Sequence, residues 1–325
     1  MNRFRTPLLR AVLVVTAALF ASTSTVAQDY PNRPIRIVNP YAPGGSTDPV
    51  VRPIAEKMTE ALGQAVIVEN KPGAGTNVGS ELVAKSKPDG YTLLLATTAL
   101  ATSPALYKKL NYDPVKDLQP VVSLIYAPFA LVVSADLPVR SVQELIAYAR
   151  ANPGKLNYGS SGNGGPIHLG MELFKSITKT DIVHVPFKGS GESIKALLSG
   201  EVQIALSPPV NFVQHEKAGR ARMLAIASPK RVPGLELSTV AESGVPGFTS
   251  GVWMALFAPA GTPRPIVDKI NAAVNRGLQN PDVVRNLNAL SMTVEGGTVE
   301  DITRMYLDEV RRWPPIVKAA GLSLD

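Results

Sequence analysis

The 325-residue sequence predicts an α/β protein built from two lobes. Short apolar runs alternate with helical patterns, which is typical of βαβ units and a mostly parallel sheet. A stretch rich in proline and glycine at 233–251 separates a second α/β series from a last apolar run. The remaining chain is helical and too poor in strands to form a third core, so we assign it to the first lobe. The chain is therefore expected to pass between the lobes twice.

The first lobe is expected to contain the N-terminal and C-terminal parts of the chain. Its N-terminal elements are a strand at 35–38, a helix at 50–62, a strand at 65–69, a helix at 77–86 and a strand at 91–96. Its C-terminal elements are a strand at 252–258 and helices at 265–280, 281–289 and 299–318. We therefore predict that lobe 1 comprises residues 28–126 plus 247–325.

The second lobe, predicted at 127–246, is expected to be an α/β unit with its own core. The expected strands lie at 129–133, 156–158, 182–185, 202–205 and 223–227. The expected helices lie at 142–151, 167–177 and 193–199. Neither lobe shows a short-period repeat or a low-complexity tract.

Residues 1–27 are interpreted as a secretory signal peptide. Arg3, Arg5 and Arg10 precede an apolar stretch at 11–20, and small residues lead to an expected cleavage site after Ala27. The apolar stretch is about half of the roughly 20 residues that a membrane-spanning helix requires. Removing the three arginines lowers the formal net charge from +7 to +4. The mature chain is thus expected to be soluble and exported.

Composition excludes several classes of function. The chain has no cysteine, so its fold must rest on packing without disulfides. Its three histidines, His168, His184 and His215, lack metal-ligand spacing, so no metal site is expected. Because export also removes ready access to nucleotide cofactors, no cofactor is expected. Lysine and arginine are scattered along helical segments, which argues against nucleic-acid binding.

A glycine-containing loop at 40–48, here called the first loop, is the leading candidate for an anion site. It reads Pro40-Tyr-Ala-Pro-Gly-Gly-Ser-Thr-Asp48 and joins a strand to a helix, whose first amides lack intrahelical partners. Gly44, Gly45 and Ser46 are expected to donate to an anion, with Tyr41 as a wall. Asp48 followed by Pro49 is typical of a helix N-cap. Whether Asp48 contacts the ligand or only caps the helix stays open.

A second loop, at 158–165, repeats this pattern. It carries four glycines between Gly159 and Gly165, more than one turn requires, and a helix is expected to begin near Pro166. A third junction at 185–191 contributes Phe187, Lys188 and Gly189, for which ligand contact and a solvated lysine are equally plausible. The segment 70–75 is interpreted as a structural turn, and the Thr97-Thr98 pair either lines the cleft or caps the next helix.

Motifs of three enzyme classes are incomplete in these loops. The string Gly159-Ser-Ser-Gly-Asn163 fails the G-x-S-x-G nucleophile elbow at its last position. The first loop lacks the Gly-Lys-Ser/Thr ending of a P-loop and the dinucleotide G-x-G-x-x-G. Binding without chemistry is therefore favoured over catalysis.

Several motifs resemble those of one known family. They are the first loop with Arg52, Asn70-Lys-Pro-Gly-Ala-Gly75, Tyr158-Gly-Ser with His168-Leu, Val185-Pro-Phe-Lys-Gly189 and Ala258-Pro-Ala-Gly-Thr-Pro263. In this order, and over essentially the whole mature chain, they resemble the Bug-type receptors, the extracytoplasmic solute-binding proteins of tripartite tricarboxylate transporters. The resemblance implies a two-lobed periplasmic binding protein (type II, Venus-flytrap) that closes on a small carboxylate.

The resemblance and the loop patterns together define the expected site. The expected ligand contacts are Tyr41, Ala42, Pro43, Gly44, Gly45, Ser46, Thr47, Asp48, Thr97, Ser160, Ser161, Gly162, Asn163, Gly164, Gly165, His168, Phe187, Lys188 and Gly189. The family often has glycine at the position of Thr76, a hydroxyl residue at Gly165 and tyrosine at Phe187. Because the last two differences remove hydroxyls, a less polar ligand such as an aromatic or monocarboxylic acid is expected.

The sequence thus predicts a monomeric, non-enzymatic receptor that presents a bound carboxylate to a membrane permease. Two alternatives stay open. One is an exported hydrolase or lyase that uses Asp48 or His168, and the other is a sensor that presents its ligand to a membrane signalling protein.

Overall fold

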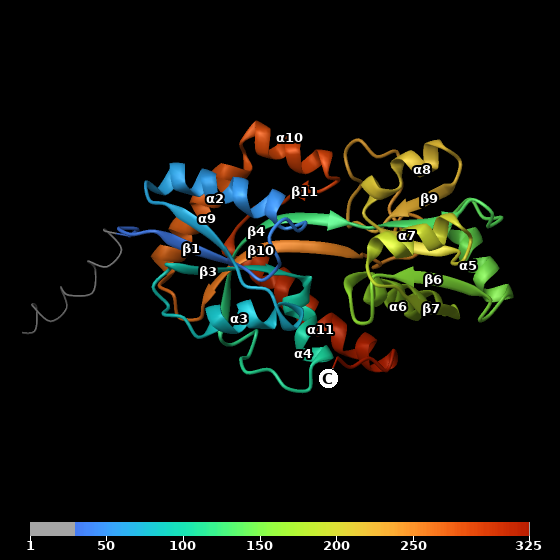
Figure 1. Cartoon of the computed structure of the whole chain (residues 1–325), viewed down its shortest axis with the longest axis horizontal. Coiled ribbons are helices and arrows are strands. Elements are labelled where there is room, and N and C mark those ends of the chain that lie inside the picture. The colour runs from blue at the N-terminus through green and yellow to red at the C-terminus, as the bar shows by residue number, and fades with distance from the viewer. Residues whose placement is uncertain (1–29, 325) are drawn as a thin grey trace, which may run out of the picture.

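The computed structural model describes residues 30–324, so the expected signal peptide lies outside the described residues. The chain forms two mixed sheets that lie side by side, each flanked by helices (Figure 1). No helix within residues 30–324 is long and apolar enough to cross a membrane. The expected two-lobed α/β architecture is confirmed.

The first sheet has six strands in the order β11-β4-β10-β3-β1-β2. Its strands are β1 (Ile35–Asn39), β2 (Val66–Asn70), β3 (Thr92–Thr97), β4 (Leu118–Pro128), β10 (Gly251–Pro259) and β11 (Thr293–Val294). Strands β2, β1 and β3 run parallel, whereas β10 pairs antiparallel with both β3 and β4. The returning strand β10 therefore lies in the centre of this sheet.

The second sheet has five strands in the order β7-β6-β8-β5-β9. Its strands are β5 (Ala130–Ser134), β6 (Leu156–Ser160), β7 (Ile182–Pro186), β8 (Ile204–Ser207) and β9 (Ala221–Ile226). Strand β5 is antiparallel to both β8 and β9, while β6 is parallel to β7 and β8. The expectation of a mostly parallel sheet was wrong in both lobes, because β5 and β10 each enter a sheet against the direction of their neighbours.

Helices cover both faces of the first sheet and flank the second (Figure 1). In the first lobe they are α2 (Asp48–Leu62), α3 (Asn77–Ala84), α4 (Thr98–Leu106), α9 (Arg264–Leu278), α10 (Pro281–Ala289) and α11 (Val299–Ala319), with the short helix η2 (Ala74–Thr76). In the second they are α5 (Val142–Ala151), α6 (Pro166–Thr178), α7 (Ser190–Leu198), α8 (Val213–Lys217) and η3 (Pro209–Asn211). Every expected strand and helix is present.

Two substantial elements escaped the sequence-based prediction. Helix α4 is buried along most of its length, so its small apolar, threonine and serine residues show no amphipathic period. Strand β4 begins and ends among prolines, which disguise it as a connection. Both elements matter for the site, since α4 borders the cavity described below and β4 leads into the second sheet.

The two sheets are joined at two places. Strand β4 ends at Pro128 and β5 begins at Ala130, while the return runs from Ile226 at the end of β9 to Gly251. The largest cluster of buried apolar side chains extends from the first sheet into the second. The exact lobe boundaries stay a prediction.

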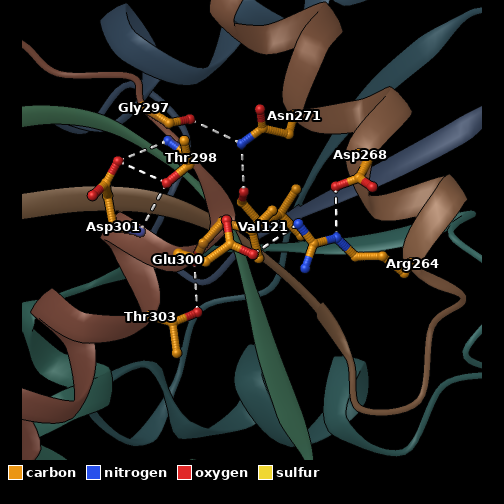
Figure 2. A network of polar contacts seen from close by, with 10 residues as sticks. Val121, Arg264, Asp268, Asn271, Gly297, Thr298, Glu300, Asp301 and Thr303 are labelled. Atoms are coloured by element: carbon orange, nitrogen blue, oxygen red, sulfur yellow. Dashed lines mark hydrogen bonds and ion pairs between the residues drawn. The ribbon is translucent and has the colours of Figure 1, made fainter.

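A polar network fixes the C-terminal helices on the first sheet (Figure 2). The side-chain nitrogen Nδ2 of Asn271 donates to the carbonyls of Val121 in β4 and of Gly297 ahead of α11, at 2.9 and 3.0 Å. Thr298 and Asp301 form a reciprocal capping box at the start of α11. These bonds hold α11 in the position from which its C-terminal end reaches the second lobe.

Candidate functional site

The first loop joins β1 to α2, and Asp48 shapes it. The Gly44 amide donates to Asp48 Oδ2 at 2.7 Å, and Asn39 Nδ2 donates to Oδ1 at 3.1 Å. The hydrogen bond from Gly44 lowers the pKa of Asp48, and the Arg52 guanidinium at 3.3 Å lowers it further. The carboxylate is therefore ionised and already bound within the loop.

The expected capping role of Asp48 needs correction. The N-cap of α2 is Thr47, whose side chain makes no capping bond, and Asp48 is the first helical residue. Thr47 is buried, and its hydroxyl donates to Asn39 Oδ1 and accepts from Asn39 Nδ2. Asp48 therefore closes this loop by accepting the hydrogen bond from the Gly44 amide, and it does not act as the N-cap of α2.

These bonds decide which first-loop amides remain for a ligand. The Gly44 amide is taken by Asp48, and the Gly45 amide points to the Ala42 carbonyl at 3.4 Å. Within residues 30–324, the Ser46 amide has no hydrogen-bond partner. Of the three expected donors, only Ser46 therefore has a free amide in this conformation.

Tyr41 is fixed as a wall by contacts with two other elements. Its hydroxyl lies 2.7 Å from Thr97 Oγ1, and its carbonyl accepts from Asn70 Nδ2 at 2.9 Å. Burial raises the pKa of the Tyr41 phenol, which is thus neutral. Thr97 is the N-cap of α4, accepting a hydrogen bond from the Ala99 amide. Tyr41 and Thr97 therefore position each other.

The second loop leads from β6 into α6 and is held by contacts with two histidines. Ser160 Oγ lies 2.6 Å from Nε2 of His184 and accepts from the Gly162 amide at 3.2 Å. The Gly164 amide donates to Nδ1 of His168 at 3.1 Å. Gly162 and Gly164 have φ of +129° and +72°, which other residues adopt only with strain. Both glycines are therefore required by the backbone.

Neither Ser160 nor His168 is accessible in this conformation. Ser160 is 0% and His168 4% exposed. The pKa of His168 is lowered to about 4. Burial is the largest cause, and the neighbouring His184 is the second. Burial also lowers the pKa of His184. Both imidazoles are therefore neutral near pH 7 and support the loop from within the fold.

The third junction contacts the second loop. The Phe187 amide donates to the Ser160 carbonyl at 3.0 Å, which ties the two segments together. The Lys188 amide donates to Glu192 Oε2 at 3.0 Å, while the Lys188 residue is exposed. Gly189 precedes α7 with φ of +115°. The Phe187 ring is half-buried, and a Cβ at Gly159 would lie 3.2 Å from it.

A cavity of about 420 Å³ opens between the two sheets. Tyr41 and Ala42 reach it from the first loop, and Asn163, Gly164 and Gly165 reach it from the second. Its other lining residues are Pro40, Pro72, Gly73, Ala74, Gly75, Thr76, Thr98, Ala99, Thr102, Ser103, Leu106, Tyr107, Pro166, Leu169, Ser250, Gly251, Trp313 and Leu324. None of the described residues that line it is charged. The cavity thus brings the two predicted loops together.

The remaining expected contacts lie outside the lining of this cavity. They are Pro43, Gly44, Gly45, Ser46, Thr47, Asp48, Thr97, Ser160, Ser161, Gly162, His168, Phe187, Lys188 and Gly189. Several cavity residues were not expected, chiefly those of α4 and the C-terminal residues Trp313 and Leu324. No local sequence signal places the chain end beside the second loop, where the Leu324 amide bonds the Leu106 carbonyl at 2.9 Å.

The segment 73–76, which overlaps the structural turn that we predicted at 70–75, also lines the cavity. Its four consecutive residues Gly73, Ala74, Gly75 and Thr76 have φ of +139°, +45°, +60° and +86°. A β-branched residue such as Thr76 is strained in this region. This strain explains why the family often has glycine at the position of Thr76. Strained backbone beside a cavity is characteristic of ligand sites.

Two lobes joined by two crossings, with glycine loops facing an interlobe cavity, define a solute-binding protein. The family model of the tripartite tricarboxylate transporter family receptor (TctC) matches residues 50–322. The chain belongs to this family of periplasmic carboxylate-binding receptors.

Curated relatives extend over the whole chain. A UPF0065 protein from the tcbD-tcbE intergenic region of Pseudomonas sp. strain P51 is 38% identical, covering 95% of this chain and 93% of the relative. Protein BugT of Bordetella pertussis is 35% identical, covering both chains completely.

Solved structures of relatives share the fold. R. palustris Rpa4515 with adipate is 36% identical with a TM-score of 0.74, covering 91% of this chain and 100% of that one. MatC from Rhodopseudomonas palustris with bound malate is 35% identical with a TM-score of 0.70, covering 89% and 100%. A TctC solute-binding protein from Polaromonas is 29% identical and has a TM-score of 0.81, covering 89% and 99%.

Proposed function

We propose that this receptor holds its carboxylate between the first and second loops and presents the closed form to a membrane permease. The observation that carries the proposal is the uncharged interlobe cavity, which residues of both loops line. Closure about the two crossings would bring the loops toward each other, and a permease would distinguish the open and closed states. Solved relatives with adipate and malate support a carboxylate as ligand.

Backbone amides supply the binding chemistry in this proposal. Within the described residues, the amides of Ser46 in the first loop and of Ser161, Asn163 and Gly165 in the second have no hydrogen-bond partner. Asn163 and Gly165 line the cavity, whereas Ser46 and Ser161 lie outside its lining and would reach the ligand only when the lobes close. Helices α4 and α6 begin at the cavity, and their positive dipole ends favour an anion. Because hydrogen bonds to a charged group contribute about 1.5–3 kcal/mol each, a few amides suffice without an arginine.

The lining favours a monocarboxylic acid with an alkyl or aromatic body. Leu106, Leu169 and Trp313 contribute apolar surface, and no lysine or arginine among the described residues lines the cavity. A second carboxylate would therefore lose water without gaining a cation. Buried apolar surface would instead stabilise a ring or chain.

A thermal-shift panel tests this ligand class. Benzoate and hexanoate are expected to raise the melting temperature more than malate, adipate or citrate at equal concentration. A ligand at 100 times its dissociation constant stabilises the folded state by about 2.7 kcal/mol. The ligand class is wrong if malate or citrate gives the largest shift, and the site itself is in doubt if no acid gives any.

The enzymatic alternative is disfavoured by the positions of its two candidate groups. The Asp48 carboxylate is committed to Gly44, Asn39 and Arg52, and His168 is buried beneath the second loop. We therefore propose binding without turnover. Conversion of any bound acid by the purified protein would overturn this part of the proposal. A sensor that presents the same closed form to a membrane signalling protein remains the second candidate.

We also propose that the chain is exported, cleaved after Ala27 and monomeric. Native mass spectrometry of freshly purified periplasmic protein measures all three properties together. The expected species is a monomer starting at Gln28 that carries one small acid. A dimer or an uncleaved chain would contradict the corresponding part of the proposal.

A further inference from the structure

Two stacked histidines lie directly beneath the second loop. The rings of His168 in α6 and His184 in β7 have centroids 3.7 Å apart and planes at 26°. His168 Nδ1 accepts from the Gly164 amide at 3.1 Å, and His184 Nε2 lies 2.6 Å from Ser160 Oγ. One imidazole therefore holds the beginning of the glycine loop, and the other holds its end.

The proton positions on His168 follow from these contacts. An Nδ1 that accepts from an amide carries no proton, so the neutral ring has its proton on Nε2. That nitrogen faces Glu172 Oε1 at 4.0 Å. A second proton would have to go on Nδ1, where it would point at the Gly164 N–H and break the bond. The loop shape seen here thus requires a neutral His168.

We infer that His168 and His184 are positioning residues of the carboxylate site. This inference rests on the proposed function of the second loop. By occupying the Gly164 amide and the Ser160 hydroxyl, the two rings hold the loop so that the amides of Ser161 and Asn163 between these two contacts, and that of Gly165 directly after them, remain for the ligand. Neither ring contacts the ligand itself.

The other two loops show why this position carries a histidine. In each, a loop amide donates to a side chain four residues later: Gly44 to Asp48 and Lys188 to Glu192. Those acceptors are carboxylates, whereas the acceptor beneath the second loop is neutral. His168 is 4% exposed, and burying a carboxylate there would cost far more than burying a neutral ring. A carboxylate would also repel an anionic ligand.

The charged groups around His168 and His184 leave both imidazoles neutral. Glu172 and Lys175 of α6 form an ion pair of 2.7 Å, and their effects on the pKa of the imidazoles oppose each other. Tyr158 of β6 stacks on His184 with centroids 4.9 Å apart and donates to Glu172 at 2.7 Å. Desolvation therefore dominates, and it disfavours the imidazolium form.

Paired substitutions separate positioning from simple packing. His168→Phe keeps a ring against His184 but removes the acceptor, whereas His168→Asn keeps an acceptor near the Nδ1 position. By calorimetry with benzoate at pH 7, we expect His168→Phe to bind about tenfold more weakly, since one hydrogen bond to the loop is lost. His168→Asn is expected to stay within about threefold of wild type. His215→Phe, on α8 outside the cavity lining, serves as the matched control and should bind like wild type.

A second readout needs no ligand. The amide NMR resonance of Gly164 is expected to titrate with His168 in wild-type protein and to be independent of pH in His168→Asn over the same range. The inference is overturned if folded His168→Phe binds benzoate as tightly as wild type, or if the Gly164 resonance ignores His168. Should wild-type protein bind none of the acids in the panel, the proposed site fails, while the Gly164 titration still tests the positioning contact.

Discussion

The first and second loops solve the same structural problem with different acceptors. Each places a glycine amide on a side chain four residues later, in the first turn of the following helix: Gly44 on Asp48 and Gly164 on His168. Asp48 is partly exposed and lies beside Arg52, so a charge is tolerated there. His168 is buried and neutral. Solvent access thus decides which acceptor can close the loop.

This comparison also changes which donors face the ligand. The glycines that mark each loop in the sequence serve mainly to shape the backbone, and their amides are partly consumed within the loop. The free amides include those of Ser46 in the first loop and of Ser161 and Asn163 in the second, together with that of the last loop glycine, Gly165. Each loop therefore uses glycine conformation mainly to present the amides of neighbouring residues.

The largest expected effect comes from removing a glycine conformation in the second loop. Gly162→Val places a β-branched residue at φ of +129°, although its Cβ would meet only the Phe187 carbonyl at 3.9 Å. Strain of about 1–3 kcal/mol predicts roughly 10- to 100-fold weaker binding of benzoate by calorimetry. Gly191→Val, where φ is ordinary and the surroundings are open, is the matched control. Equal affinities for the two variants would contradict the role assigned to the loop conformation.

Asp48 and His168, which accept the hydrogen bonds from the Gly44 and Gly164 amides, are expected to titrate in separate pH windows. The folded pKa of His168, about 4, lies below its ordinary 6.5, so the unfolded chain takes up the proton first as pH falls. The free energy of unfolding should therefore decrease by up to about 3 kcal/mol between pH 6.5 and 4. Asp48, whose pKa is also lowered, should lose its contribution only below its ordinary 3.8. Urea unfolding across pH measures both.

The histidine variant identifies the source of the first window. His168→Asn should flatten the stability profile between pH 6.5 and 4 except for the part due to His184. An unchanged slope in this variant would show that His168 is not the group responsible.

Relief of backbone strain in the segment 73–76 should raise the free energy of unfolding, by less than the titration of His168 lowers it. Thr76→Gly places the residue that tolerates φ of +86° at this position. Removing strain of about 1–2 kcal/mol outweighs the loss of a small buried side chain, so the free energy of unfolding should rise by about 1 kcal/mol. Thr102→Gly, in the regular helix α4, should lower it instead. A destabilised Thr76→Gly would show that Thr76 packing outweighs the strain.

The smallest effect on binding is expected from Asp48→Asn. Its side-chain oxygen can still accept from the Gly44 amide, so affinity for benzoate should change by less than about threefold. Stability should fall by about 1 kcal/mol, because the negative charge at the start of α2 and its pairing with Arg52 are lost. Calorimetry and urea unfolding measure the two quantities. A large loss of affinity would instead place the carboxylate of Asp48 in the ligand site.

Local patterns in the sequence predicted much of this molecule. The alternation of strand and helix patterns indicated the two lobes, and glycine loops at helix starts indicated both sides of the cavity. The antiparallel entry of β5 and β10 was not predictable in this way, because strand direction depends on the path of the chain between elements. Helix α4 was missed because its burial on nearly all sides removes the amphipathic period.

Individual site residues were harder to predict than loops. A sequence shows that Gly44 and Gly164 can approach an anion, but not that Asp48 and His168 already occupy their amides. The positive φ of Thr76 likewise has no signal in a single threonine. Leu324 reaches the cavity only through the tertiary position of α11, which no local pattern encodes.

The measurement that tests the central claim most directly is a crystal structure with the acid that stabilises the protein most. The account predicts one carboxylate between the lobes, within hydrogen-bond distance of the Ser46 amide and of at least one amide among Ser161, Asn163 and Gly165. The Gly44–Asp48 and Gly164–His168 bonds should persist in that structure. A carboxylate held by one lobe alone, or bound to the amides of Gly44 and Gly164 after those bonds have broken, would contradict it.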